Sequence, residues 1–595
     1  MLGTYAAVLA VCGASLAYGQ AAIALCGVRR WSWLAPPVGL ALLLAVCWGT
    51  VRLPGDGVVP AILVPLLLIA AVGFLRGRVE GGGEALRAGW PVALGALVAA
   101  SLPFIAEGHF GILGTSFNPD MSQHLLAADR LADGHGSQLL TQGYPLGPHS
   151  LVVALDKGLG IGLVQGFSGL TVAVAVLAPL TALAAFAQLR ALPRTAAALV
   201  VGLAYVVASY FAQGAFKETM EALLLLGFVL ALREAGRGWA GLPLRFVPAA
   251  LIAVGAVYAY SFPGLIWLGG AFVFWLLAEA ALGRRQPPWR PLLLAALPFV
   301  VLIAPEIGRM IDFQQFETFD PNGPGLGNLF GQVSPFEALG IWPSGDFRLA
   351  PGDGAVPAIG YYLGAAFALV LLVHGIWRCA KDREVAILSG LAAAALAYAA
   401  GRLGGTAYAS AKAIEVAAPI CALVILLPLL AKRSSSQAAG GGAVGGPTAE
   451  EALATAGRGG TAVTGPAAAW LAYAFIAVAG VCSLLALANA PVGPTSYTSA
   501  LNDFRKQVGA GPSLVLADPE LLEDEHGMPF LSWELRGGRV CIRSRDEPGG
   551  LPPGTRFVIT EKGGTYQLRE VPDPPPGKSP CPLIAVRQAR QGPAR

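Results

Sequence analysis

The sequence predicts an α-helical protein that crosses a membrane many times and ends in a small extracytoplasmic α/β domain. Only 13% of its 595 residues are charged, and the mean hydropathy is +0.62. Soluble proteins carry about twice that share of charged residues, roughly 25%. Apolar runs as long as a membrane-spanning helix recur along the chain, whereas residues 490–595 are polar and contain short β-like runs. A polytopic membrane domain followed by a small folded domain accounts for both regions.

About fourteen apolar runs approach the ~20 residues that a helix needs to cross a bilayer. Because several runs are short or closely spaced, we expect about 12 to 14 membrane-spanning helices. The first run has neither a basic leader nor an A-x-A cleavage site, which indicates a retained helix rather than a signal peptide. The runs lie at residues 4–27, 32–52, 59–76, 90–106, 168–190, 195–213, 217–234, 245–260, 262–283, 290–308, 355–378, 384–402, 408–431 and 467–489.

Lysine and arginine residues predict the orientation of these helices in the cell (inner) membrane. If the N-terminus lies outside, every second loop is cytoplasmic, and these are the loops that carry the basic residues. The C-terminal domain then lies outside as well. The net charge of +4 gives no support for nucleic-acid binding, so we expect membrane lipids and no nucleic acid as partners. The basic loops contain Arg29, Arg30; Arg76, Arg78, Arg87; Arg190, Arg194; Arg233, Arg237, Arg245; Arg284, Arg285, Arg290; Arg378, Lys381, Arg383; and Lys432, Arg433.

Composition divides the chain into four parts. Residues 1–432 form the membrane domain, with long external loops at 107–167 and 309–354. The low-complexity segment 433–466 follows, and we expect it to be a disordered cytoplasmic linker. The last membrane-spanning helix, 467–489, leads into the C-terminal domain, 490–595.

Two β-like runs and two cysteines characterise the C-terminal domain. The runs "SLVLA" (513–517) and "RFVIT" (556–560) are separated by turn residues, which predicts strands of a small α/β domain. Cys541 and Cys581 are the two cysteines of this polar region, whereas the other six lie in or beside apolar runs. If the domain is outside the cell membrane, these two can form a disulfide.

The first external loop gathers ionisable residues. Asn118 and Pro119 are typical of a helix start and Gly134 of a helix stop, so we expect a short helix over 119–133. Its apolar residues recur at helical spacing, which predicts that it lies along the membrane surface with the apolar face down. The loop also holds four of the six histidines, namely His109, His124, His135 and His149.

Asp120 and His124 are the candidate catalytic pair of this loop. They are four residues apart and therefore share one face of the expected helix. Asp120 lies in the first turn, where the helix dipole stabilises its ionised form, and a carboxylate in that state suits a general base or a metal ligand. In the alternative interpretation, Asp120 is only a first-turn acid and His124 only a solvated side chain.

The motif D-x-x-x-H-x-x-x-A-x-x-L-x-x-G, which begins at Asp120, is followed by Y-P-x-G-x-H from Tyr144 to His149. Together they resemble the first external loop of bacterial GT-C glycosyltransferases, polytopic enzymes that use polyprenyl-phosphate-linked sugars. The resemblance covers residues 120–149 and extends to the GT-C-like architecture of many helices, long external loops and a C-terminal external domain. It implies that Asp120 is the catalytic base or positions the acceptor, that His124 orients Asp120 or the acceptor, and that Tyr144 and His149 contact substrate.

A polyprenyl-phosphate donor also requires fixed cations near the outer surface. Lys412 lies about one turn inside a membrane helix, where an ionisable residue is a functional candidate by default. Tyr408, Lys412 and Pro419 resemble the family's "Y…K…P" segment, so Tyr408 is a further substrate-binding candidate. Arg402 and Lys217 are the other donor-phosphate candidates. Alternatively, these cations only reach lipid headgroups.

The sequence thus favours a glycosyltransferase, inverting or retaining, that moves a sugar from a polyprenyl-phosphate donor to a cell-envelope glycan acceptor. No cofactor is evident, although Asp120 could hold a divalent cation. A transporter or flippase of lipid-linked glycans is the alternative, but it should place its ionisable residues near the bilayer midplane. An O-antigen-type polymerase or ligase ranks lower, because the 309–354 loop has no histidine and only Arg309 and Arg348 as basic residues.

Overall fold

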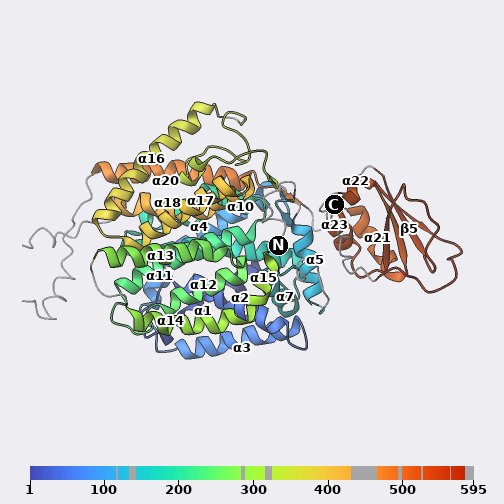
Figure 1. Ribbon diagram of the computed structural model, residues 1–595, viewed down its shortest axis with the longest axis horizontal. Coiled ribbons are helices and arrows are strands. Elements are labelled where there is room, and N and C mark those ends of the chain that lie inside the picture. Colours follow the sequence, from blue (N-terminus) through green and yellow to red (C-terminus); the bar gives the residue numbers. More distant parts are fainter. Residues whose placement is uncertain are drawn as a thin grey trace, which may run out of the picture.

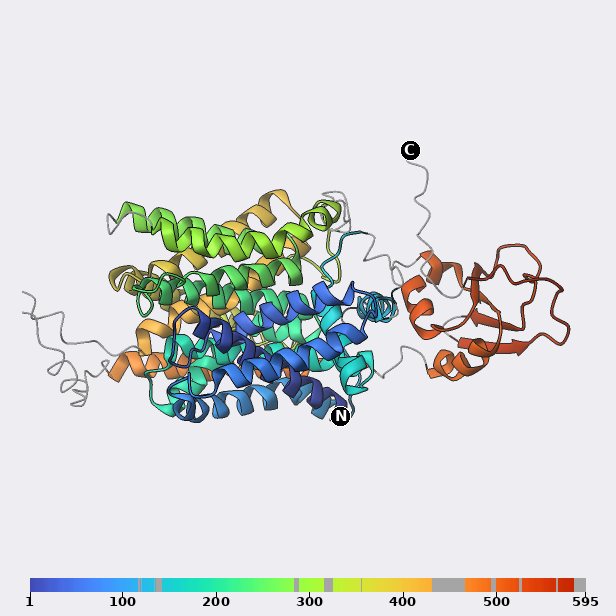
Figure 2. The same ribbon diagram turned by 90° about the horizontal axis from the view of Figure 1, so that it is seen from below.

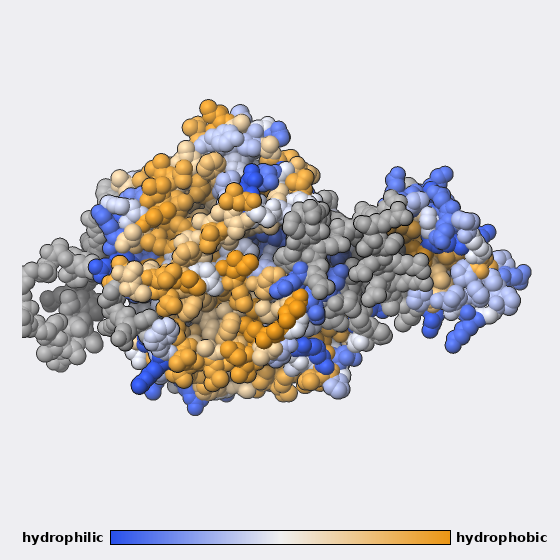
Figure 3. Space-filling view, in the orientation of Figure 1, coloured by the Kyte–Doolittle hydropathy of each residue, from blue (hydrophilic) through white to orange (hydrophobic). Residues whose placement is uncertain are grey.

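The computed structural model shows a bundle of long helices and a separate C-terminal sheet domain beyond one end of it (Figures 1 and 2). Side chains on the bundle surface are apolar over a broad area, whereas those on the C-terminal domain are mostly hydrophilic (Figure 3). The structure describes residues 1–115, 118, 120–132, 134, 142–282, 288–314, 325–354, 356–430, 466–493, 499–523, 527–562 and 565–582.

Ten helices of the described residues are long and apolar enough to cross a membrane, which supports a multi-pass membrane protein. Each overlaps one of the apolar runs that predict it. They are α1 (Leu2–Leu25), α3 (Val58–Leu75), α4 (Gly82–Ala106), α8 (Leu163–Phe186), α13 (Gly264–Ala281), the segment made of α14 (Trp289–Ile303), η1 (Ala304–Glu306) and α15 (Ile307–Phe313), α16 (Ala358–Lys381), α17 (Val385–Gly404), α18 (Ala407–Leu430) and α20 (Pro466–Ala488).

The other four apolar runs also form helices, but each departs from a simple span. Two are short, α2 (Ala35–Val51) and α12 (Val247–Tyr260). A third is broken into α9 (Ala191–Gly202) and α10 (Tyr205–Ala212), which are bent by 56°. The fourth, α11 (Phe216–Gly236), is long enough but carries three charged residues in its first two turns. The broken pair α9–α10 and the charged start of α11 adjoin the candidate site described below.

The bundle is centred on α8 and α18. Of their most apolar windows, 89% and 94% are buried, against 6% for the peripheral helix α3. Small residues allow close approach elsewhere in the bundle. A Cβ on Gly19 of α1 would lie 1.8 Å from the Ala35 carbonyl oxygen of α2, and one on Gly39 would lie 1.7 Å from the Ser15 carbonyl oxygen. Glycine is therefore the residue that fits at both positions.

Shorter elements lie at the end of the bundle that faces the C-terminal domain (Figure 1). The strands β1 (Ile112–Leu113) and β2 (Val492–Gly493) pair there in antiparallel register. The helices α5 (Met121–Ala132) and α7 (Gly147–Leu159) pack on each other, and the 3-10 helix η3 (Pro335–Leu339) packs on α18.

Helix α5 corrects the expectation of a membrane-surface helix. Ten of its twelve residues are buried, including both apolar and polar side chains. One side of α5 packs on α7 and α8, and helix α23 of the C-terminal domain packs on it as well. The periodicity of 119–133 predicts a buried stripe correctly, but it cannot reveal that a segment four hundred residues later covers the rest.

The C-terminal domain is a four-stranded mixed sheet in the order β4-β3-β5-β6. Strand β3 is parallel to both β4 and β5, and β5 pairs antiparallel with β6. Its elements are α21 (Ser499–Ala510), β3 (Ser513–Ala517), α22 (Pro519–Glu523), α23 (Gly527–Glu534), β4 (Val540–Ser544), β5 (Phe557–Lys562) and β6 (Thr565–Glu570). Strand β3 coincides with the run 513–517 that predicts it, and β5 overlaps the run 556–560 and extends two residues beyond it.

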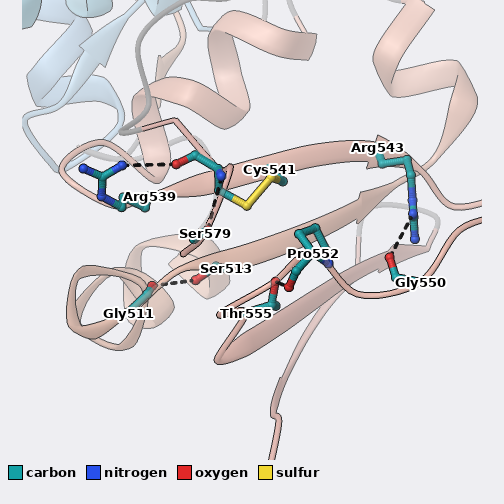
Figure 4. The surroundings of a disulfide bond; sticks show 10 residues. Gly511, Ser513, Arg539, Cys541, Arg543, Gly550, Pro552, Thr555 and Ser579 are labelled. Carbon is teal, nitrogen blue, oxygen red and sulfur yellow. Dashed lines mark hydrogen bonds between the residues drawn. A yellow bond between two sulfur atoms is a disulfide. The ribbon is translucent and has the colours of Figure 1, made fainter. Parts of the chain in front are cut away.

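A disulfide joins Cys541 of β4 to Cys581, which follows β6 (Figure 4). The segment after β6 runs back along β4, since the Val540 N–H donates to the Pro582 carbonyl oxygen at 2.9 Å. The disulfide thus fastens the end of the described chain to the edge strand of the sheet.

Candidate active site

A cavity lies where α5, α10, α11 and α18 meet at the end of the bundle that faces the C-terminal domain. Its empty volume is about 430 Å³, which includes its opening to solvent. The lining is mainly polar and aromatic, and it comes from segments far apart in the sequence. The lining residues are Asn118, Asp120, Met121, His124, Tyr210, Gln213, Gly214, Ala215, Phe216, Lys217, Glu218 and Tyr408.

Asp120 is fixed immediately before α5 by a local hydrogen-bond motif. Its backbone N–H donates to Asn118 Oδ1 at 3.0 Å, while Asn118 Nδ2 donates to Asp120 Oδ2 at 3.2 Å. Its own carbonyl accepts from the His124 N–H at 3.2 Å, which starts the helix. Asn118 therefore acts at the helix start, as its residue type predicts, and it also orients the carboxylate of Asp120 in the cavity wall.

His124 lines the cavity one turn further along α5, and its ring is held by a second histidine. His124 Nδ1 lies 3.1 Å from His149 Nε2 of α7, so one of these two nitrogens donates and the other accepts. His149 is completely buried. The rings of Phe167 and Phe216 pack around both imidazoles. The structure thus connects His124 to His149, a pairing that neither sequence position alone predicts.

Lys217 supplies a cation to the cavity from the first turn of α11. Its ammonium group donates to the Tyr144 hydroxyl and lies 4.1 Å from the centroid of the Tyr144 ring. Lys217 also interacts electrostatically with Asp120 across the cavity and with its neighbour Glu218. A base candidate and a cation candidate, 97 residues apart in the sequence, therefore face the same space.

Lys412 lies directly behind the cavity wall. Its Nζ is 3.0 Å from Glu218 Oε1 and 4.1 Å from the centroid of the Tyr408 ring, and both of these residues line the cavity. The Tyr260 hydroxyl donates to the same Glu218 oxygen at 3.4 Å. Lys412 therefore holds two wall residues in place, and it acts on the cavity through them.

The remaining predicted site residues are placed as follows. Tyr144 and His149 lie one layer behind the wall, in contact with Lys217 and His124 respectively. Arg402 is exposed near the end of α17 and does not line the cavity. His135 falls outside the described residues. Of the donor-phosphate candidates, Lys217 is thus the one in the cavity wall.

Tyr210 and Gln213 are lining residues that the sequence interpretation missed. Both follow the break between α9 and α10, and Gln213 accepts a hydrogen bond from the Asn328 amide of the second long loop. Tyr210 is 1% exposed, and none of the described residues forms a hydrogen bond with its hydroxyl. A polar residue at each end of "YFAQ", just after a broken apolar run, is the signal that could have identified them.

Two carboxyl groups lie one turn deeper in the bundle than the Glu218–Lys412 ion pair. Glu221 follows Glu218 by three residues on α11, and Glu415 follows Lys412 by three on α18. Both are completely buried, and none of their four carboxyl oxygens has a hydrogen-bond partner in the described part of the chain. Among the described residues, no group of three or more His, Cys, Asp or Glu side chains is arranged to hold a metal ion.

Comparison with known proteins adds no assignment, because neither a protein-family model nor a curated protein matches this sequence significantly. The function is therefore argued from the cavity itself. It combines two carboxylates, one imidazole, an ammonium group, two phenol rings and two amides within one partly open space. This set can remove a proton, bind an anion and contact a polyhydroxy ligand.

Proposed function

We propose that the protein is a membrane glycosyltransferase that moves a sugar from a polyprenyl-phosphate donor to an acceptor glycan on the extracytoplasmic side of the cell membrane. The observation that supports this most is the shared cavity of Asp120 and Lys217. Glycosyl transfer needs a base for the acceptor and a cation for the departing phosphate, and both must reach one reacting carbon. The cavity offers both.

In the proposed reaction, the acceptor hydroxyl oxygen forms a bond to the anomeric carbon of the donor sugar. The bond from that carbon to the phosphate oxygen breaks, and its electron pair stays on the phosphate. Asp120 accepts the proton of the acceptor hydroxyl, and Lys217 stabilises the negative charge that grows on the phosphate. His124, held by His149, contributes the polar wall next to Asp120.

The other lining residues suit a sugar in the cavity. Tyr408 and Tyr210 present aromatic side chains, and Gln213 presents an amide that is already fixed by Asn328. Glu218 is held by Lys412 and Tyr260, so its position is set before any ligand enters. Preformed donors and acceptors of this kind limit the ordering cost of binding.

A transporter of lipid-linked glycans is the second candidate, and two observations favour it. The α9–α10 pair is broken beside the cavity, and broken helices are typical of transporter binding sites. Glu221 and Glu415 also lie inside the bundle, where transporters place ionisable groups. The glycosyltransferase is preferred because the charged wall residues lie at the start of their helices rather than at mid-bundle.

The test is sugar transfer by the purified protein in liposomes, measured with a panel of polyprenyl-phosphate sugars and a glycan acceptor. We expect Asp120→Asn to lower the transfer rate by at least about a hundredfold, because the amide cannot accept the proton. Asp382→Asn is the matched control, since Asp382 is half exposed and pairs with Arg378 away from the cavity. It should transfer at the wild-type rate.

Two results would contradict the proposal. If Asp120→Asn transferred sugar at the wild-type rate, Asp120 would not be the catalytic base. No transfer from any donor, together with translocation of a fluorescent lipid-linked glycan across the liposome membrane, would favour the transporter.

A further inference from the structure

Helix α23 of the C-terminal domain has two buried sides that face different parts of the molecule. Leu531 and Leu535 are completely buried in the core of the C-terminal domain. Trp533, between them in the sequence, is 2% exposed and packs with the hydrophobic core of the membrane domain. Residues two apart on a helix point about 200° away from each other, so this alternation places α23 between the two cores.

The element that receives α23 is α5. Arg536, just after α23, reaches Asp129 of α5 with an Nε–Oδ1 distance of 3.7 Å. Its guanidinium lies 3.4 Å from the centroid of the Trp533 ring, and its Nη1 donates to the Trp533 carbonyl at 2.6 Å. Trp533 and Arg536 thus form one contact unit, with an apolar anchor and a charged partner for α5.

A second connection joins the same two regions. Ile112 and Leu113, which precede α5, pair with Gly493 and Val492, which precede the C-terminal domain. The Gly114 N–H continues this ladder by donating to the Pro491 carbonyl at 2.8 Å. Backbone hydrogen bonds therefore join the segment that leads into α5 to the segment that leads into the C-terminal domain.

These contacts hold the far half of the helix whose near end carries the candidate base. Asp129 follows Asp120 by nine residues, a rise of about 13 Å along a helix axis. An α-helix is stiff over that length, so a shift of α5 at Asp129 moves Asp120 and His124 as well. Misplacement of a catalytic group by about 1 Å can slow a reaction about a hundredfold.

We propose that the C-terminal domain is a clamp, in which Trp533 and Arg536 hold α5 and thereby position Asp120 and His124 in the cavity. Trp533 and Arg536 are positioning residues, because they act through α5 and do not line the cavity. The catalytic consequence rests on the proposed function, whereas the clamp itself is a statement about α5 and can be tested separately.

The direct test is amide hydrogen exchange of the α5 peptide in the full-length protein in detergent micelles. We expect exchange in residues 121–132 to become about tenfold faster in Arg536→Ala and in Trp533→Ala, because α5 loses its cover. Trp533→Phe serves if Trp533→Ala fails to fold. Arg543→Ala is the matched control, since Arg543 bonds to the carbonyls of Gly549 and Gly550 within the domain (Figure 4).

Charge exchange and steady-state kinetics distinguish the clamp from a general loss of stability. Asp129→Arg alone should behave like Arg536→Ala, and Asp129→Arg combined with Arg536→Asp should restore slow exchange. In the transfer assay, Arg536→Ala should lower kcat about tenfold and leave KM for the donor within about twofold.

Unchanged α5 exchange in folded Arg536→Ala and Trp533→Phe would overturn the clamp, whatever their activity. Faster α5 exchange in a protein that transfers no sugar would support the clamp and remove the proposed function instead.

Discussion

Two buried networks of charged residues lie toward opposite ends of the helical bundle, and they differ in how completely their polar groups are bonded. At the cavity, Lys412 pairs with Glu218, while the nearby carboxyl groups of Glu221 and Glu415 have no hydrogen-bond partner among the residues that the structure describes. At the other end, Glu384 accepts three hydrogen bonds, two from Arg233 at 2.8 and 2.9 Å and one from Arg237 at 2.8 Å. The carboxyl groups of the cavity network are thus only partly hydrogen-bonded, whereas both carboxylate oxygens of Glu384 are bonded.

This difference indicates different roles. Helices α11 and α17 are joined by the Arg233–Glu384 bonds, which satisfy both carboxylate oxygens in the planar geometry that arginine prefers. Because these bonds join two segments of the bundle and leave neither carboxylate oxygen unbonded, we assign the network a structural role. A network with buried, unbonded polar groups beside a cavity stabilises the fold less, and such groups are typical of functional sites. We therefore expect substitutions at the two networks to affect different measurements.

Lys217→Met should have the largest effect, and it should appear in catalysis. In the proposed reaction the ammonium group stabilises the departing phosphate, so we expect its loss to lower transfer about a thousandfold. The midpoint of thermal unfolding should change little, because the methionine side chain can fill the same apolar path between Tyr144 and Tyr260. The measurement is initial transfer rate together with a thermal melt. Lys217→Arg, which keeps the charge, should recover part of the rate.

Glu384→Gln should have the next largest effect, and it should appear in stability. The amide removes the negative charge that Arg233 and Arg237 share and leaves Arg233 only the more distant Glu234 at 3.8 Å, and breaking a buried ion pair costs about 3–5 kcal/mol. Denaturation in mixed micelles measures the change in the free energy of unfolding. The more exposed pair Arg378–Asp382 is the control, and Asp382→Asn should cost less than about 1 kcal/mol. A large loss of transfer with unchanged stability in Glu384→Gln would remove the distinction between the networks.

The sequence predicts much of this arrangement and misses a specific part of it. Every apolar run is helical, although one is broken into α9 and α10, because span length and hydropathy are local properties. Asp120, His124, Lys217 and Tyr408 are also visible as candidates, because a charged or polar residue in an apolar chain stands out. The contact of Gln213 with Asn328 and that of Asp129 with Arg536 join segments 115 and 407 residues apart, and no local pattern records such pairings. Arg402 stood out equally well, yet it is exposed and does not line the cavity, since helix periodicity does not fix which face meets a ligand.

Acid should lower the stability that the Glu384 network contributes in the wild type. This loss should be smaller than the loss caused by Glu384→Gln. Burial raises the pKa of the Glu384 carboxyl, but the hydrogen bonds and charges of Arg233 and Arg237 outweigh it and hold this pKa below its ordinary value of 4.5. A lowered pKa contributes stability above pH 4.5, and that contribution is lost as the pH falls below 4.5 through the folded-state pKa. The wild type should therefore lose stability below that pH relative to Glu384→Gln. Parallel pH profiles for the two proteins would contradict the expectation.

The smallest effects on stability should come from Glu221→Gln and Glu415→Gln. Each replacement keeps the shape of the side chain, and no hydrogen bond within the described structure is lost, because none of the four oxygens has a partner there. We expect the free energy of unfolding to change by less than about 1 kcal/mol, in contrast to Glu384→Gln. A glycosyltransferase that acts at the cavity should keep its transfer rate in both variants, whereas a transporter that uses these groups should lose translocation. A loss of about 3 kcal/mol or more in either variant would show that its carboxyl group is bonded after all, and the contrast between the two networks would then disappear.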